Sequence, residues 1–155
     1  MKNTSLDKTD KAILKMLQQD CTLSVSEIAE RVALTTTPCW KRIQRLEQQN
    51  IISKRVALLK PQNIGLDLVV VVMIKTSNHE STWLEKFAEH AASFDEVVEF
   101  YRLSGIYDYM LKVIVPDMSS FDVFYKKLVA KVNIAEVTSS FAMEQIKYTT
   151  ALPIK

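Results

Sequence analysis

Apolar residues recur at helical spacing along the first 46 residues, and this pattern predicts three helices. The first opens at Leu6–Asp7, with Asp7 or Asp10 near the positive end of the helix. A short helix is predicted for residues 25–32, because Ser24 and Glu27 have the spacing of a capping box. The third helix covers residues 34–46. The apolar positions on the inner faces are Leu6, Ile13, Leu14, Leu17, Ile28, Val32, Cys39, Ile43 and Leu46.

The start of the third helix is rich in hydroxyl groups. Thr35, or failing that Thr37, is expected to cap this helix with its side-chain oxygen. Pro38 fits the first turn, because the N–H groups there have no partner inside the helix. Ala33–Leu34 forms a tight turn from the preceding helix. A support helix, a short helix, a turn and a further helix in this order predict a helix-turn-helix motif.

The third helix also carries cations away from its apolar stripe. Arginines there can read guanine edges, while hydroxyls and the helix N-terminus can hold phosphates. An ordinary solvated amphipathic helix has the same pattern, so the third helix alone does not distinguish the two interpretations. The two helices that precede it favour DNA binding. Trp40 is expected to pack against the domain core, with a smaller expectation that its edge reaches DNA. The predicted DNA contacts on this helix are Thr35, Thr36, Thr37, Lys41, Arg42 and Arg45.

Residues 51–59 alternate loosely between apolar and polar and are rich in branched side chains. This pattern favours a small strand pair with Lys54 and Arg55 at its tip. In a winged form of the motif these two side chains meet phosphate, so both join the predicted DNA contacts.

The second half alternates strand and helix patterns in the order βαββαβ, which predicts an α+β, ferredoxin-like sandwich. Both helices are expected on one face of the sheet, so the other face is left with apolar surface. Self-association into a homodimer would cover that face and place two reading helices on one duplex. The predicted elements are a strand at 66–76, a helix at 81–93, strands at 97–103 and 109–115, a helix from Asp117 or Ser119, and a strand at 137–148.

Charge divides the chain in a similar way. Residues 1–60 hold 11 Lys and Arg against 6 Asp and Glu, a net charge of +5, and residues 61–155 have a net charge of −3. A basic front half suggests a polyanion partner, here double-stranded DNA. The expected domains are a winged helix-turn-helix at 1–60, a hinge at 61–65 and the sandwich at 66–155. The hinge is the only stretch that combines proline and glycine.

Few groups suited to catalysis or metal binding are present. Cys21 and Cys39 are not spaced like metal ligands, and two cysteines are too few for a disulfide framework. Both are taken as reduced packing residues. His79 and His90 have no evident serine or cysteine nucleophile beside them, and no Gly-rich phosphate loop occurs. An enzyme is therefore the weaker alternative, and no cofactor or metal is expected. No long apolar run or signal-peptide pattern occurs, so a cytoplasmic location without membrane contact is expected.

Segments along essentially the whole chain, in order and at matching spacing, together carry a family resemblance. They are Leu6-Asp7…Asp10…Ile13-Leu14…Leu17, residues 28–35, Pro38-Cys39…Arg42-Ile43…Leu46-Glu47…Ile51-Ile52, Gly105…Tyr107-Asp108-Tyr109, Val115-Pro116-Asp117-Met118 and Met143-Glu144…Ile146-Lys147. On these residues the chain resembles the leucine-responsive regulatory protein/AsnC family of transcription regulators. Residues 21–24, 35–42 and 138–144 look closest to a branch that includes cysteine-responsive regulators.

The resemblance implies a winged helix-turn-helix joined to a regulatory sandwich of the RAM type. It also implies dimers that assemble further, commonly to octamers, with a small amino acid bound between dimers. Candidate effectors are cysteine, leucine, alanine and methionine. The effector contacts carried over are Gly105, Tyr107, Asp108, Met118, Thr138, Ser139 and Ser140. Asp108 would take the ammonium group, and N–H groups near Gly105 with the hydroxyls of 138–140 would take the carboxylate.

These residues also have purely structural alternatives. Asp108 can close a turn, Met118 can fill a core, and Ser139 and Ser140 can face solvent on a strand. The expected function is sequence-specific transcriptional regulation in which assembly and DNA affinity respond to a bound amino acid. The alternative is a constitutive architectural DNA-binding protein without an effector.

Overall fold

The computed structural model describes residues 5–77, 80–130, 132 and 134–155, so the predicted loop position of His79 lies outside the described residues. The chain forms two compact units. The helical unit contains the chain up to Leu58 together with Lys147–Lys155, and the sheet unit contains Leu59–Ile146. None of the helices in the described ranges is long and apolar enough to span a bilayer.

The helical unit consists of α1 (Lys8–Leu17), α2 (Val25–Arg31) and α3 (Thr36–Gln48). Capping boxes begin the first two helices, through Asp7 in α1 and Ser24 in α2, and the spacing of Ser24 and Glu27 predicted the second of them. The three helices enclose one apolar cluster, which confirms the helical periodicity. Its buried members are Ile13, Leu14, Leu17, Ile28, Ala29, Cys39, Ile43 and Leu46.

The turn between α2 and α3 depends on one residue in the left-handed region. Ala33 has φ +54°, and Leu34 N–H then donates to Ala29 O at 2.9 Å. Thr35 is the N-cap residue of α3, but its side chain makes no capping hydrogen bond. The position of the cap was therefore predicted correctly and its side-chain bond was not.

The strand pair expected at 51–59 is absent. Residues 53–60 are exposed and have no regular secondary structure. A strand forms only where a neighbour completes its hydrogen-bond ladder, and within the described residues this segment is not paired in any sheet. A 3₁₀ helix at Pro61–Ile64 follows, and Gly65, at φ +76°, ends it in the left-handed conformation that glycine tolerates.

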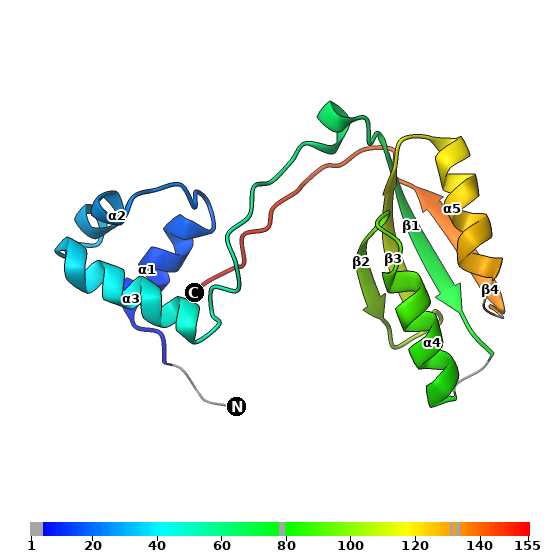
Figure 1. Cartoon of the computed structure of the whole chain (residues 1–155), viewed down its shortest axis with the longest axis horizontal. Helices are drawn as coiled ribbons and strands as arrows, with labels where there is room; N and C mark the ends of the chain where they lie inside the picture. Colours follow the sequence, from blue (N-terminus) through cyan, green and yellow to red (C-terminus); the bar gives the residue numbers. More distant parts are fainter. Residues whose placement is uncertain (1–4, 78–79, 131, 133) are drawn as a thin grey trace. The chain divides into compact units, whose positions relative to one another are not determined.

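The sheet unit has the predicted βαββαβ order. Its elements are β1 (Leu68–Lys75), α4 (Ser81–Ala92), β2 (Val97–Arg102), β3 (Tyr109–Val115), α5 (Met118–Ala130) and β4 (Glu136–Phe141). The strands are antiparallel and lie in the order β2-β3-β1-β4. Both helices cover the same face of this sheet (Figure 1).

Every second side chain along β1 and β3 points into the core between the sheet and the helices. Val70, Val72 and Ile74 are buried against α4 and α5, as are the odd-numbered residues of β3. His90 on α4 makes a polar contact with α5, because its Nε2 lies 3.2 Å from the backbone oxygens of Lys127 and Leu128. This histidine therefore joins two helices.

The other face of the sheet carries apolar side chains that these helices do not cover. Val71 and Met73 of β1 point to it, and Met73 lies opposite Met110 in the register. Tyr101 and Val98 on β2 are about half exposed, at 49% and 50%. An open apolar face of this kind usually marks an interface.

The end of the chain corrects two expectations. β4 ends at Phe141 and not at residue 148, because Ala142 N–H bonds to Val69 O close to where β1 begins, and the partner strand runs out there. The last residues then return to the helical unit instead of remaining with the sandwich. The Gln18 side-chain amide donates to Leu152 O and accepts from Leu152 N–H, both at 2.9 Å. Ile154 packs against the helical core.

Removing residues 151–155 is expected to destabilise the helical unit by about 1–2 kcal/mol, because the chain loses two hydrogen bonds and an apolar contact. Thermal unfolding followed by Trp40 fluorescence, in a Trp83→Phe background, measures this unit alone. Gln18→Ala, which removes only the hydrogen bonds, should show a smaller decrease in melting temperature. Unchanged melting in both variants would show that the tail does not stabilise the unit.

Candidate functional site

α3 presents two contrasting sides. Cys39, Ile43 and Leu46 are buried, whereas the first-turn residues 36–38 and Lys41 are exposed. The hydroxyls and the first N–H groups of α3 are thus open to an anion, because Thr35 provides no side-chain cap. Among the described residues Lys41 forms no ion pair.

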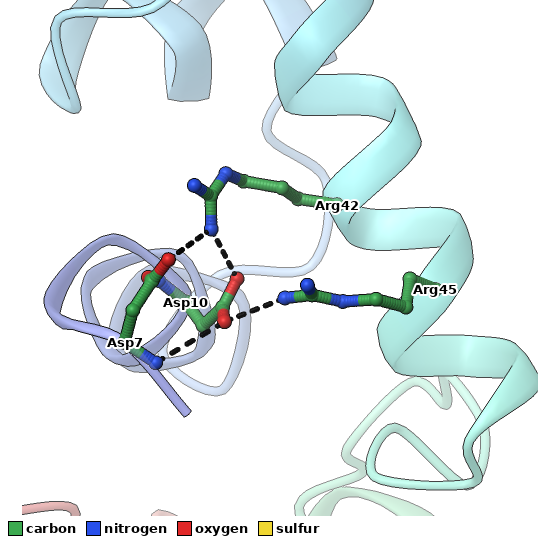
Figure 2. A network of polar contacts seen from close by, with 4 residues as sticks. All are labelled: Asp7, Asp10, Arg42 and Arg45. Carbon is green, nitrogen blue, oxygen red and sulfur yellow. Dashed lines mark hydrogen bonds and ion pairs between the residues drawn. The ribbon is translucent and has the colours of Figure 1, made fainter. Parts of the chain in front are cut away.

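The two arginines of α3 bind carboxylates of α1 (Figure 2). Arg42 Nη1 lies 2.6 Å from Asp7 Oδ2 and 2.8 Å from Asp10 Oδ1, and Arg45 Nη2 lies 2.6 Å from Asp10 Oδ2. The Asp10 side chain is only 1% exposed. Asp7 and Asp10 also close the capping box, since Asp10 N–H donates to Asp7 Oδ1 at 2.8 Å. The network therefore holds α3 against the start of α1.

These contacts change the electrostatics of both partners. The Asp10 N–H, and then the Arg42 guanidinium, lower the pKa of Asp7 below its ordinary value of 3.8. Hydrogen bonds to Asp7 and then Asp10 raise the pKa of Arg42. Both groups stay charged over the whole physiological range, so the pair is permanent at neutral pH.

The arginines are therefore not the free outward cations that the sequence analysis expected. Their spacing from the apolar stripe directs them to the flank of α3 that faces α1. The signal that could have found this is Asp10, which lies at helical spacing from Leu6, Ile13 and Leu17 on the inner face of α1. An acid among apolar positions needs a cationic partner, because burying a lone charge is costly.

Lys54 and Arg55 lie on the exposed segment after α3. Arg55 Nη2 contacts Glu47 Oε1 at 2.9 Å, which ties this segment to the last turn of α3. Trp40 differs from its expectation, because it is 50% exposed and is not part of the helical core.

A second group of predicted residues meets at one end of the sheet. Asp108 N–H donates to Ile74 O at 2.9 Å, and its carboxylate Oδ2 accepts from Thr76 N–H at 2.8 Å. Asp108 thus fixes the turn before β3 to the end of β1, as its structural alternative predicted. Within the described part of the chain, no donor reaches its second carboxylate oxygen, Oδ1.

Two more predicted residues join Asp108. Tyr107 Oη lies 3.3 Å from Thr138 Oγ1 and 3.5 Å from Glu136 Oε1, which links the turn to the start of β4. Gly105 has φ +146°, a conformation that other residues rarely adopt. Thr76 and Glu136 were not among the predicted residues, because backbone donors and edge-strand neighbours are visible only once the sheet register is known.

The remaining predicted residues lie apart from this turn. Ser139 opposes buried Val72 and so lies on the helix side of β4, whereas Ser140 opposes Val71 and lies on the open face. Met118 begins α5, beyond the far end of β3. Within one chain it does not meet Asp108.

Comparison with known proteins accounts for both units. A winged helix-turn-helix DNA-binding model matches residues 6–53, and the Lrp/AsnC ligand-binding domain model matches residues 69–152. The chain belongs to the Lrp/AsnC family of transcriptional regulators. It is thus a DNA-binding transcriptional regulator with a ligand-binding domain, and not an enzyme.

Its relatives span the full length of the chain. It is 54% identical over 151 residues to the DNA-binding transcriptional activator DecR of Escherichia coli K12, covering 97% of this chain and 99% of that protein. A crystal structure of an AsnC family regulator from Agrobacterium tumefaciens superposes with a TM-score of 0.93 at 51% identity, covering 96% and 97% of the two chains. A Neisseria meningitidis regulator, solved as a complex with L-Met, gives 0.92 at 35% identity and the same coverage.

Arg42→Ala is expected to lower the stability of the helical unit by about 1–3 kcal/mol, because buried Asp10 loses one of its two arginine partners. Each kcal/mol corresponds to a decrease in melting temperature of roughly 4–8 °C for a unit of this size. Lys41→Ala is the matched control and should leave the melting temperature unchanged. Lys41 is the residue before Arg42, it is exposed, and it forms no ion pair within the described residues. Equal melting of both variants would contradict a structural role for the network.

Asp7→Asn keeps an N-cap side chain but removes the negative charge. The pKa of Asp7 is lowered on folding, so its charge stabilises the fold above pH 3.8 and ceases to do so as pH falls through the folded-state value. Urea unfolding from neutral pH to below pH 3 should therefore show a difference between wild type and variant that shrinks in acid. A difference that is independent of pH would contradict the charge-based account.

Proposed function

We propose that this regulator reads DNA with the exposed side of α3 and that an amino acid bound in the sheet unit changes this binding. DNA reading by α3 is supported mainly by the start of this helix, which is exposed and has no side-chain cap. Threonines and Lys41 are exposed there, on the side opposite the buried apolar stripe. Hydroxyls and first-turn N–H groups suit phosphate oxygens, and they also fix the depth of a helix in the major groove.

The predicted contacts then have different roles. Thr35, Thr36, Thr37 and Lys41 approach the duplex directly. Lys54 and Arg55, on the segment after α3, meet flanking phosphates in place of a wing. Arg42 and Arg45 act by holding α3 against α1, since Asp7 and Asp10 occupy their guanidinium groups.

The effector site that we propose is the turn of Gly105, Tyr107 and Asp108, with Thr138 beside Tyr107. An α-amino acid needs an anion for its ammonium group and hydrogen-bond donors for its carboxylate. Asp108 Oδ1, which no donor of the described residues reaches, would supply the first, and the hydroxyls of Tyr107 and Thr138, which lie 3.3 Å apart, would supply the second. The Neisseria relative that was solved with L-Met supports this ligand class. Cysteine, leucine, alanine and methionine are the candidates.

Self-association completes this scheme. The uncovered apolar face around Val71 and Met73 fits a homodimer, and further assembly, up to an octamer, would bring Met118, Ser139 and Ser140 of neighbouring copies toward an effector bound between dimers. A bound amino acid would then alter the arrangement in which helix-turn-helix pairs are presented to DNA. The site of action is the cytoplasm, where the chromosome lies.

A melting-temperature screen of the protein with each amino acid at millimolar concentration tests the sensor. One or two candidates should raise the melting temperature, because a ligand that binds only the folded state stabilises it. Asp108→Asn should abolish this rise while leaving the ligand-free melting temperature nearly unchanged, because the asparagine oxygen still accepts from Thr76 N–H.

Asp108→Ala is the matched comparison. It removes both the charge and the bond to Thr76 N–H, so it should lower the ligand-free melting temperature as well. A normal response in the Asp108→Asn variant would place the effector elsewhere. No response of the wild-type protein to any amino acid would favour a constitutive architectural DNA-binding protein.

A further inference from the structure

Trp40 is an exposed indole on the helix proposed to read DNA. It is 50% exposed and does not belong to the apolar cluster of the helical unit. None of the ring pairs among the described residues includes it. Its large apolar surface therefore faces water in the isolated chain, which costs free energy unless a partner covers it.

Helical spacing places Trp40 on the side of α3 that the core does not use. Thr36 lies one turn before it and Gln44 one turn after it, and Lys41 is the next residue along the chain. The buried residues Cys39 and Ile43 lie on the other side. Trp40 thus belongs to the same exposed surface as the first-turn threonines and Lys41.

The chemistry of this surface differs from that of a guanine reader. Arg42 and Arg45, which could bind guanine bidentately, are held by Asp7 and Asp10. The groups left at the surface are hydroxyls, one lysine and the indole, because the half-buried Gln44 amide donates to Glu47 Oε2 at 3.1 Å. Apolar side chains match the 5-methyl group of thymine.

We propose that Trp40 is a specificity-determining residue that packs on a thymine methyl group in the major groove and selects an A·T pair at that position. The proposal rests on the proposed function, because it requires α3 to be the reading helix. Phosphate contacts from Lys41 give affinity without sequence preference, whereas the indole contact distinguishes thymine from cytosine and from uracil.

Replacing thymine with deoxyuridine removes one methyl group and leaves the protein untouched, so it tests this contact directly. The probe is a duplex that the wild-type protein selects from a random pool, with each thymine replaced singly. Replacement at the contacted position should weaken wild-type binding by roughly fourfold, the effect of burying one methyl-sized group. Replacement at other thymines should have no such effect.

Two variants assign that loss to the indole. Trp40→Ala should bind the thymine and deoxyuridine probes equally at the sensitive position. Lys41→Ala should weaken binding to both probes by the same factor and keep the fourfold difference. In a Trp83→Phe background, Trp40 fluorescence should also change on binding of the selected duplex.

The possible failures are distinguishable. If the wild-type protein selects a sequence but no thymine in it responds to deoxyuridine, or if Trp40→Ala keeps the sensitivity, the inference about Trp40 is wrong and α3 can still be the reading helix. If the wild-type protein selects no sequence at all, sequence-specific reading by α3 is wrong as well. If Trp40→Ala does not fold, Trp40→Gln replaces it: this variant should also bind the thymine and deoxyuridine probes equally, and a retained fourfold difference would overturn the inference.

Discussion

The buried carboxylate of Asp10 is the constraint on which the DNA-binding half of the molecule depends. A charge at 1% exposure is tolerated only with charged and hydrogen-bonded partners, and Arg42, Arg45 and the backbone of Asp7 supply them. These partners come from the start of α1 and from the middle of α3. The hydrogen bonds and ion pairs of Asp10 therefore fix how the two helices cross. They also engage both arginines of α3 within the protein, so the exposed residues that remain to face a ligand are the threonines, Lys41 and Trp40.

Much of this molecule follows from its sequence pattern. Helical periodicity located the three helices and their core, and the alternation of strand and helix patterns predicted the βαββαβ sandwich. Both signals are local, so they can be found in one chain without its fold. The family resemblance of the motifs is confirmed by the matches over both halves.

The failures share a different physical cause. The wing strands need a hydrogen-bonding neighbour, the C-terminal tail finds its partner at Gln18, 134 residues away, and the arginines find theirs across two helices. Such non-local contacts leave little trace in local spacing. In the sheet unit the same limit applies: Thr76 and Glu136 contact Asp108 and Tyr107 because of strand register, which the sequence does not display.

The coupling that we propose joins amino-acid binding in the sheet unit to DNA binding by α3. Its most direct test is the affinity of the wild-type protein for a fluorescently labelled duplex that it selects, measured by anisotropy with and without cysteine, leucine, alanine or methionine. We expect a change in affinity of roughly 5- to 150-fold with at least one of them, the usual range of such coupling. Equal affinity with and without every amino acid, in a protein that still binds the duplex, would contradict it.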